Sequence, residues 1–143
     1  MAITQAMATS FKVQLLNGTQ NFSSNTFKIA LYTSSATINE NTTAYSASNE
    51  VPSTGNYSAG GNTLSVSVTP TNSGNVAFIS FSNTSWANAT ITAAGALIYN
   101  NTNANAAVCV LSFGGDKTST NGTFAVNFPT ADASNAIIRL TAS

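Results

Sequence analysis

The sequence predicts an all-β fold, an antiparallel β-sandwich or jelly roll preceded by a short helix. Three observations support this fold class. Apolar residues alternate with polar ones over several short segments, which is the period of a strand with one buried face. Clusters of Asn, Gly, Ser and Asp separate these segments, as turns do in sandwiches. Only the N-terminal segment has an apolar repeat of helical period.

The helix is predicted from the spacing of apolar residues near the N-terminus. These residues recur every four positions, at Ile3, Met7, Phe11 and Leu15. Gly18 follows where a left-handed residue commonly ends a helix. We therefore expect residues 1–24 to form a helix or arm whose apolar stripe packs either on the domain's own sheet or on a neighbouring subunit.

Seven strands are predicted. Three segments alternate, at 27–32, 63–69 and 123–128. Four runs are apolar on both faces, at 76–81, 91–99, 107–113 and 136–141. Such strands lie at the centre of a sandwich, or in a sheet whose outer face meets another chain.

Turn signals place the connections between these strands. They are found at 72–75, 100–103, 114–116 and 121–122. Pro70 and Pro129 are expected to end strands, because proline cannot donate a ladder hydrogen bond.

The chain is expected to form a single domain over residues 1–143, a length that can bury a substantial core. Residues 34–61 contain few apolar anchors and are predicted to be a long loop. Loops of this length in compact domains usually carry function or form contacts. Disorder and an unrecognised edge strand are the alternatives.

Composition argues against catalysis. The chain has four acidic residues, four basic residues and no histidine, so few groups can titrate or coordinate a metal near neutral pH. Glu40 or Glu50 could form a carboxylate pair with Asp116 or Asp132, as in glycoside hydrolysis, but structural or solvated roles are favoured for all four. We expect no enzyme activity, no cofactor and no metal site.

The same composition argues against several kinds of partner. The basic residues are scattered, whereas a nucleic-acid surface needs them clustered. No apolar run approaches the roughly 20 residues of a membrane span, and the N-terminus lacks the pattern of a secretory signal. Cytoplasmic synthesis is expected. Cys109 stands alone in an apolar run and is predicted to be a core residue.

The low charge favours association with other protein surfaces. Charged residues make up 6% of the chain, against about 25% in ordinary soluble domains, and the formal net charge is zero. The residues predicted to form an interface are Met7, Phe11, Leu15, Tyr45, Tyr57 and Arg139. A different interpretation is that Trp86 and Tyr99 stack on sugars, although core packing competes with it for Trp86.

A series of segments resembles a widespread family of small virion proteins of tailed bacteriophages. The segments are FKIALY (27–32), YSAGG (57–61), GALIYN (95–100), FGGDK (113–117), NGTF (121–124), FP (128–129), DA (132–133) and AIIRL (136–140). The similarity spans nearly the whole chain, and its motifs belong to turns and strands rather than to catalytic sites.

The resemblance implies a structural part of a phage particle. We expect a capsid decoration or cement protein that forms a homo-oligomer, a trimer, and binds the major capsid protein. It would be made in the host cytoplasm and located in the virion. The alternative is a tail or head-fibre component that binds host surface glycans.

Overall fold

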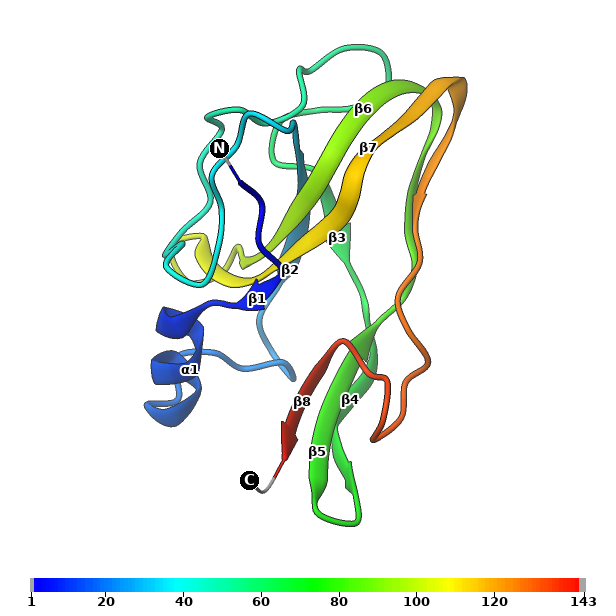
Figure 1. Cartoon of the computed structure of the whole chain (residues 1–143). Coiled ribbons are helices and arrows are strands. Elements are labelled where there is room, and N and C mark those ends of the chain that lie inside the picture. The colour runs from blue at the N-terminus through cyan, green and yellow to red at the C-terminus, as the bar shows by residue number, and fades with distance from the viewer. Residues whose placement is uncertain (1, 142–143) are drawn as a thin grey trace.

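The chain forms two antiparallel β-sheets packed against each other, with one short helix beside them (Figure 1). The computed structural model describes residues 2–141. The elements are β1 (Ala6–Met7), α1 (Thr9–Leu16), β2 (Phe27–Tyr32), β3 (Asn62–Leu64), β4 (Val66–Ser73), β5 (Val76–Phe81), β6 (Thr84–Asn100), β7 (Ala106–Val126) and β8 (Ile138–Thr141). The five-stranded sheet has the order β1-β7-β6-β2-β3, and the three-stranded sheet has the order β4-β5-β8. The predicted fold class is confirmed as a sandwich-like, mostly β fold with a short N-terminal helix.

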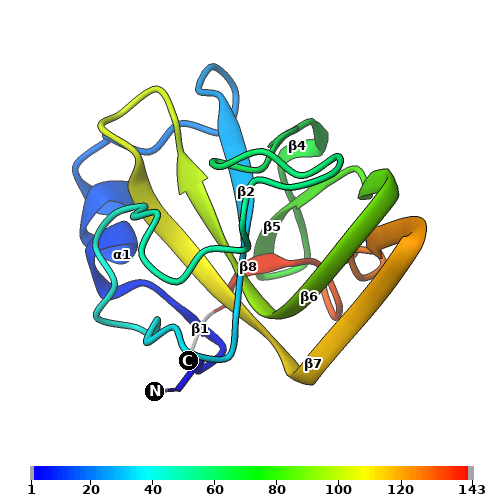
Figure 2. The same cartoon turned by 90° about the horizontal axis from the view of Figure 1, so that it is seen from above.

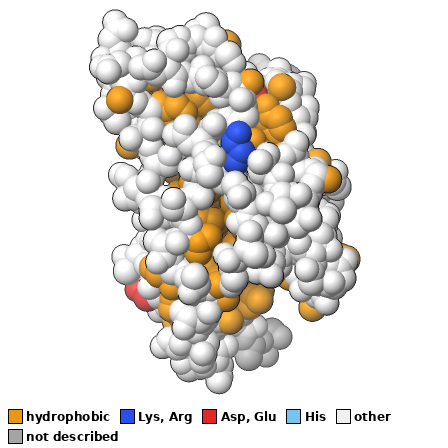
Figure 3. All heavy atoms as spheres, turned by 180° about the vertical axis from the view of Figure 1, so that it is seen from behind, with side chains coloured by type: hydrophobic (Ala, Val, Ile, Leu, Met, Phe, Trp, Pro, Cys, Tyr) orange, Lys and Arg blue, Asp and Glu red, His pale blue; other side chains and the backbone are white. Residues whose placement is uncertain are grey.

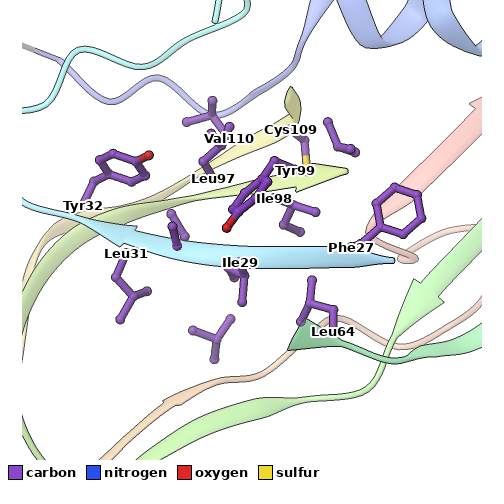
Figure 4. Packing of buried hydrophobic residues seen from close by; sticks show 14 of the residues in the cluster. Phe27, Ile29, Leu31, Tyr32, Leu64, Leu97, Ile98, Tyr99, Cys109 and Val110 are labelled. Atoms are coloured by element: carbon purple, nitrogen blue, oxygen red, sulfur yellow. The ribbon is translucent and has the colours of Figure 1, made fainter. Parts of the chain in front are cut away.

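The five-stranded sheet is covered on both faces by the chain itself. Figure 2 shows the three-stranded sheet on one side, and α1 with the cyan part of the long loop on the other. Side chains from neighbouring positions of β2 therefore enter two separate layers: in Figure 4, Ile29 and Leu31 point one way and Tyr32 points the other. This arrangement explains the apolar runs of β6 and β7 without a second chain on the outer face.

The β6–β7 hairpin is longer than the sequence predicted. Strand β7 runs through the predicted turns at 114–116 and 121–122, which are irregularities inside this strand rather than its ends. The pairing jumps from Ala93–Lys117 to Gly95–Ser112, so several residues of β7 oppose one residue of β6. Extra residues of this kind bend a strand and increase its twist. Glycine and asparagine can thus mark a bulge as readily as a turn.

The segment predicted as one strand at 63–69 belongs to two sheets. β3 ends at Leu64 and pairs with β2, whereas β4 begins at Val66 and pairs with β5. Pro70 lies inside β4 instead of ending it. The sheet tolerates this proline because β4 is an edge strand.

The N-terminal helix is shorter than predicted. Ile3 forms a parallel bridge with Ile38, and Ala6–Met7 pair with β7, so only Thr9–Leu16 are helical. Tertiary pairing outweighs the helical spacing of the first two apolar residues. The helix ends as predicted, because Gly18 has φ of +80° just after the cap residue Asn17.

The apolar stripe of α1 packs on the domain's own core. Phe11 is 0% exposed and lies edge-on to Phe22, with ring centroids 5.9 Å apart. Phe22 in turn stacks on Phe27 of β2 at 4.5 Å and contacts Phe81 of β5 at 6.1 Å. This chain of rings joins the helix to both sheets.

The last predicted strand is not buried on both faces. β8 is an edge strand that pairs only with β5, and Arg139, Leu140 and Thr141 are exposed. Its apolar composition therefore does not reflect a central position.

The long loop is ordered and has no strand of its own. Three isolated bridges pin its course, joining Ile38 to Ile3, Ala44 to Ala106 and Glu50 to Tyr32. Four apolar side chains of the loop itself are buried, those of Ala36, Ile38, Val51 and Tyr57. The loop is thus part of the layer that covers the outer face of the larger sheet.

Candidate functional site

The ionisable residues do not assemble into a catalytic centre in the part of the chain described. Residues 2–141 contain no group of three or more His, Cys, Asp or Glu side chains that could hold a metal ion. Glu40 and Asp116 are exposed, whereas Glu50 is buried. Glu50 is thus a buried carboxylate with neutral partners rather than one half of a carboxylate pair.

Glu50 anchors the end of the long loop. Its Oε1 accepts hydrogen bonds from the Tyr57 hydroxyl at 2.7 Å and from the Gly60 amide at 2.7 Å, and its Oε2 accepts one from the Tyr45 hydroxyl at 2.6 Å. The Tyr57 oxygen also accepts a hydrogen bond from the Leu31 amide at 2.9 Å. One carboxylate thus joins three points of the loop to strand β2.

Two more tyrosines bind the loop to the sheet. The Tyr32 hydroxyl donates to the Ser46 carbonyl at 2.6 Å, and the Tyr99 hydroxyl donates to the Gly60 carbonyl at 2.7 Å. The Tyr99 ring also stacks on Tyr45, with centroids 4.7 Å apart. We call Glu50 and these four tyrosines the loop anchor.

The loop anchor favours neutral tyrosines. Burial, and then the negative charge of Glu50, raise the pKa of Tyr99 to about 12. The pKa values of Tyr45 and Tyr57 are raised further, by burial first and then by their hydrogen bonds to Glu50. Burial likewise raises the pKa of Tyr32. The anchor is therefore a set of stable donors around one acceptor.

The structure places the predicted interface residues in different environments. Phe11 and Tyr57 lie in the core of the chain and offer no surface to a partner. Met7, Leu15 and Tyr45 are partly buried and pack against that core. Arg139 is exposed, and its guanidinium donates to the Ala133 carbonyl at 3.5 Å. The six residues do not form one surface.

The two aromatic residues proposed to stack on sugars are also internal. Trp86 is 4% exposed and lies 5.6 Å from the Tyr57 ring, centroid to centroid. Tyr99 is 2% exposed beneath Tyr45. Neither ring has a face that a sugar could reach in this structure.

Two further ionisable groups have local roles. Cys109 is buried, as predicted, and burial raises the pKa of its thiol to about 12. Asp132 accepts hydrogen bonds from the side chain and backbone of Asn135 and from the Ser134 amide, which lower its pKa. Asp132 therefore shapes the turn before β8.

An apolar groove opens between the end of α1 and the inner face of the three-stranded sheet. It has a volume of about 220 Å³, and its lining includes Leu15, Phe22, Ile79, Ile138 and Leu140. None of its lining residues is charged. The core covers only part of the inner face of β5 and β8. Ile138 is buried, whereas Leu140, two positions along β8, is 51% exposed. The uncovered part of this face forms one wall of the groove.

Exposed apolar side chains are also found on α1, whose Leu15 lines this groove. Leu16 is 91% exposed and Val13 is 57% exposed. Neither residue stands out in the sequence, because both fall outside the four-residue apolar repeat that marks the buried stripe. On the face seen in Figure 3, hydrophobic atoms gather in patches among mostly uncharged polar ones.

A second concavity, the polar cup, lies within the long loop. Its volume is about 460 Å³, and its lining residues are Tyr32, Ala36, Thr37, Ile38, Asn39, Asn41, Thr42, Thr43, Ala44, Ser46, Ser48 and Asn49. No lining residue is charged. Sequence reasoning identified the loop as a candidate contact region, but it could not show that the polar residues surround a hollow.

Comparison with models of known protein families, with curated proteins and with solved structures finds no match. In addition, none of residues 2–141 belongs to a helix long and apolar enough to cross a membrane.

Proposed function

We propose that this protein is a structural component of a bacteriophage virion, a capsid decoration or cement protein that acts as a homo-oligomer. The resemblance of its strand and turn motifs to small phage virion proteins supports a place in the phage particle. Its charge-poor surface supports the mode of action, because little electrostatic repulsion opposes contact between copies or with a shell.

The observation that carries the proposal is the apolar groove together with the exposed Leu16, which follows the groove residue Leu15 on α1. Both the groove and this side chain are uncharged, and they belong to the same chain. We infer that Leu16 of one copy enters the groove of the next. Such a head-to-tail contact uses two different patches and closes into a ring when the rotation between copies permits, and a trimer is the smallest such ring.

The physical contribution is burial of apolar surface. Removing apolar area from water contributes about 25 cal/mol per Å², and many copies around a shell add their contributions. In this proposal the oligomer lies on the major capsid protein and reinforces the shell against the pressure of packaged DNA. The contact depends little on salt, because it contains few charges for ions to screen.

The test measures assembly and shell stability with the same variants. Leu16→Ser and Leu140→Ser should shift the purified protein toward monomer in analytical ultracentrifugation, whereas Ala131→Ser, at an exposed alanine away from the groove, should not. Particles that lack the protein should regain resistance to heat-induced DNA release when the unaltered protein is added, equally at low and high salt.

Two results would count against the proposal. The first is a wild-type protein that stays monomeric at high concentration and does not bind the particles. The second is particle binding that weakens strongly as salt is raised, which would mean that charges rather than apolar surface make the contact.

A further inference from the structure

We propose that the polar cup of the long loop binds an uncharged saccharide. The cup shares only Tyr32 with the loop anchor, and this inference is independent of the proposed structural role. It also differs from sugar stacking on Trp86 and Tyr99, whose rings are buried.

The chemistry of the lining selects a hydroxylated, neutral ligand. Besides Tyr32, whose hydroxyl donates to the Ser46 carbonyl, eight of its side chains carry a hydroxyl or an amide: Thr37, Asn39, Asn41, Thr42, Thr43, Ser46, Ser48 and Asn49. Each of these groups both donates and accepts hydrogen bonds, as does each hydroxyl of a sugar. The exposed Glu40 lies between two lining residues in the sequence, so an anionic ligand meets a negative charge at this part of the loop.

The size and floor of the cup also suit a sugar. Its volume of about 460 Å³ falls within the range of about 300–1,000 Å³ found for small-molecule sites. The exposed Ala44 and the methyl groups of the exposed Thr37 and Thr43 supply apolar surface to the lining, against which the C–H groups of a sugar can rest. A mostly polar lining with a small apolar floor matches the two kinds of surface that a pyranose presents.

The walls of the cup are fixed before any ligand arrives. The Glu40 carbonyl accepts from the Thr9 amide at 2.8 Å, and the Thr43 carbonyl accepts from the Ala107 amide at 2.9 Å. At the other side, the Ser46 carbonyl accepts from the Tyr32 hydroxyl at 2.6 Å, and the Asn49 carbonyl accepts from the Thr33 amide at 3.0 Å. A site held in this way loses little conformational entropy on binding.

Some lining side chains shape the cup and others face a ligand. Thr42 Oγ1 accepts from the Asn39 amide at 2.9 Å, and Asn39 Oδ1 accepts from the Asn41 amide at 2.9 Å. These two side chains therefore hold the turn. Asn41 and Thr43 are exposed lining residues whose described hydrogen bonds use only backbone groups, so we assign their side chains to ligand contact.

The experiment is a titration of the isotope-labelled protein followed by amide resonances. The neutral probes are maltotriose and the trimer of N-acetylglucosamine, and the anionic probe is sialyllactose. We expect a neutral trimer to shift resonances of residues 36–49 in a saturable manner, and sialyllactose to shift them less. Glucose and N-acetylglucosamine serve as monomeric probes: tighter binding of a trimer indicates a polysaccharide chain as the ligand, and equal binding indicates a free sugar.

Matched variants test the assignment. Thr43→Val and Asn41→Leu should each weaken binding about fivefold, the effect of one lost hydrogen bond. Thr130→Val, at an exposed threonine outside the cup, should leave binding unchanged. The amide spectrum of each variant also reports whether it is folded.

The proposal is overturned if no neutral probe produces saturable shifts at 36–49, if sialyllactose binds as well as the neutral probes, or if Thr130→Val weakens binding as much as Thr43→Val. Its failure is separable from that of the proposed function, because Leu16→Ser should impair assembly while leaving sugar binding intact.

Discussion

Replacing the buried carboxylate of the loop anchor gives the sharpest test of how this fold holds its long loop. In Glu50→Ala, the Tyr45 hydroxyl, the Tyr57 hydroxyl and the Gly60 amide all lose their acceptor. Hydrogen bonds to charged groups contribute about 1.5–3 kcal/mol each, but the variant also relieves the cost of burying a charge. Tyr45 is only partly buried, so water can replace its partner. We expect a net loss of about 3–5 kcal/mol in the free energy of unfolding.

Two further variants isolate the cause. Glu50→Gln keeps an acceptor oxygen and the shape of the side chain, so its cost should be smaller, about 1–2 kcal/mol. Glu40→Ala removes an exposed carboxylate from the same loop and should change stability by less than about 0.5 kcal/mol. The order of stability is then wild type and Glu40→Ala, followed by Glu50→Gln and Glu50→Ala.

Urea denaturation measures these differences through the midpoint and slope of the transition. Limited proteolysis adds a local measurement, because release of the anchor should expose residues 33–61 to cleavage before global unfolding. The reasoning fails if Glu50→Ala costs no more than Glu40→Ala, or if the loop of Glu50→Ala resists cleavage as well as that of the wild type.

Two other predictions follow from backbone geometry and from the buried tyrosines. Gly61→Ala should prevent folding or lower the free energy of unfolding by more than about 4 kcal/mol, because the new Cβ would overlap the Ile29 carbonyl. Gly74→Ala is the control: Gly74 has φ of +57° but no atom within 4 Å of the new Cβ, so the same urea assay should show a loss of about 1–2 kcal/mol. Alkali should destabilise the protein, because folding raises the pKa of Tyr99 to about 12 and the pKa values of the other three tyrosines further. The stability that the neutral tyrosines contribute is complete below a pH of about 10, where tyrosine of the unfolded chain titrates, and is lost as the pH rises above that value. Circular dichroism and tyrosinate absorbance should change together, and tyrosines that ionise near pH 10 in a protein with an intact fold would contradict this.

Much of the core could be predicted from the sequence, because alternation and apolar runs depend on local spacing alone. The segment 27–32 forms β2 with the predicted bounds, and Gly74 and the asparagines after Tyr99 lie at the predicted hairpin turns. Cys109 is buried where its apolar neighbours placed it. These features need no knowledge of distant residues.

Other features depended on partners far away in the chain. The Gly114–Gly115 pair reads as a turn, yet it lies in a strand because Lys117 and Ser112 both find partners on β6. Asn100 resembles any turn asparagine, but its side chain is buried and donates to Gln20 at 2.8 Å and to Asn25 at 2.9 Å. Local pattern cannot separate a bulge from a turn, or a buried amide from an exposed one.

By itself, the sequence determined a charge-poor, sandwich-like β fold with a short helix, because burial period and composition are properties of the chain alone. The tertiary structure decided which apolar residues stay outside. Phe11 was absorbed into the core, whereas Leu16 remained exposed on the helix that borders the groove. It also turned the polar loop into a cup and gave Glu50 its three donors. Hollows and buried charges require segments distant in sequence to meet, and that meeting is set by packing rather than by spacing.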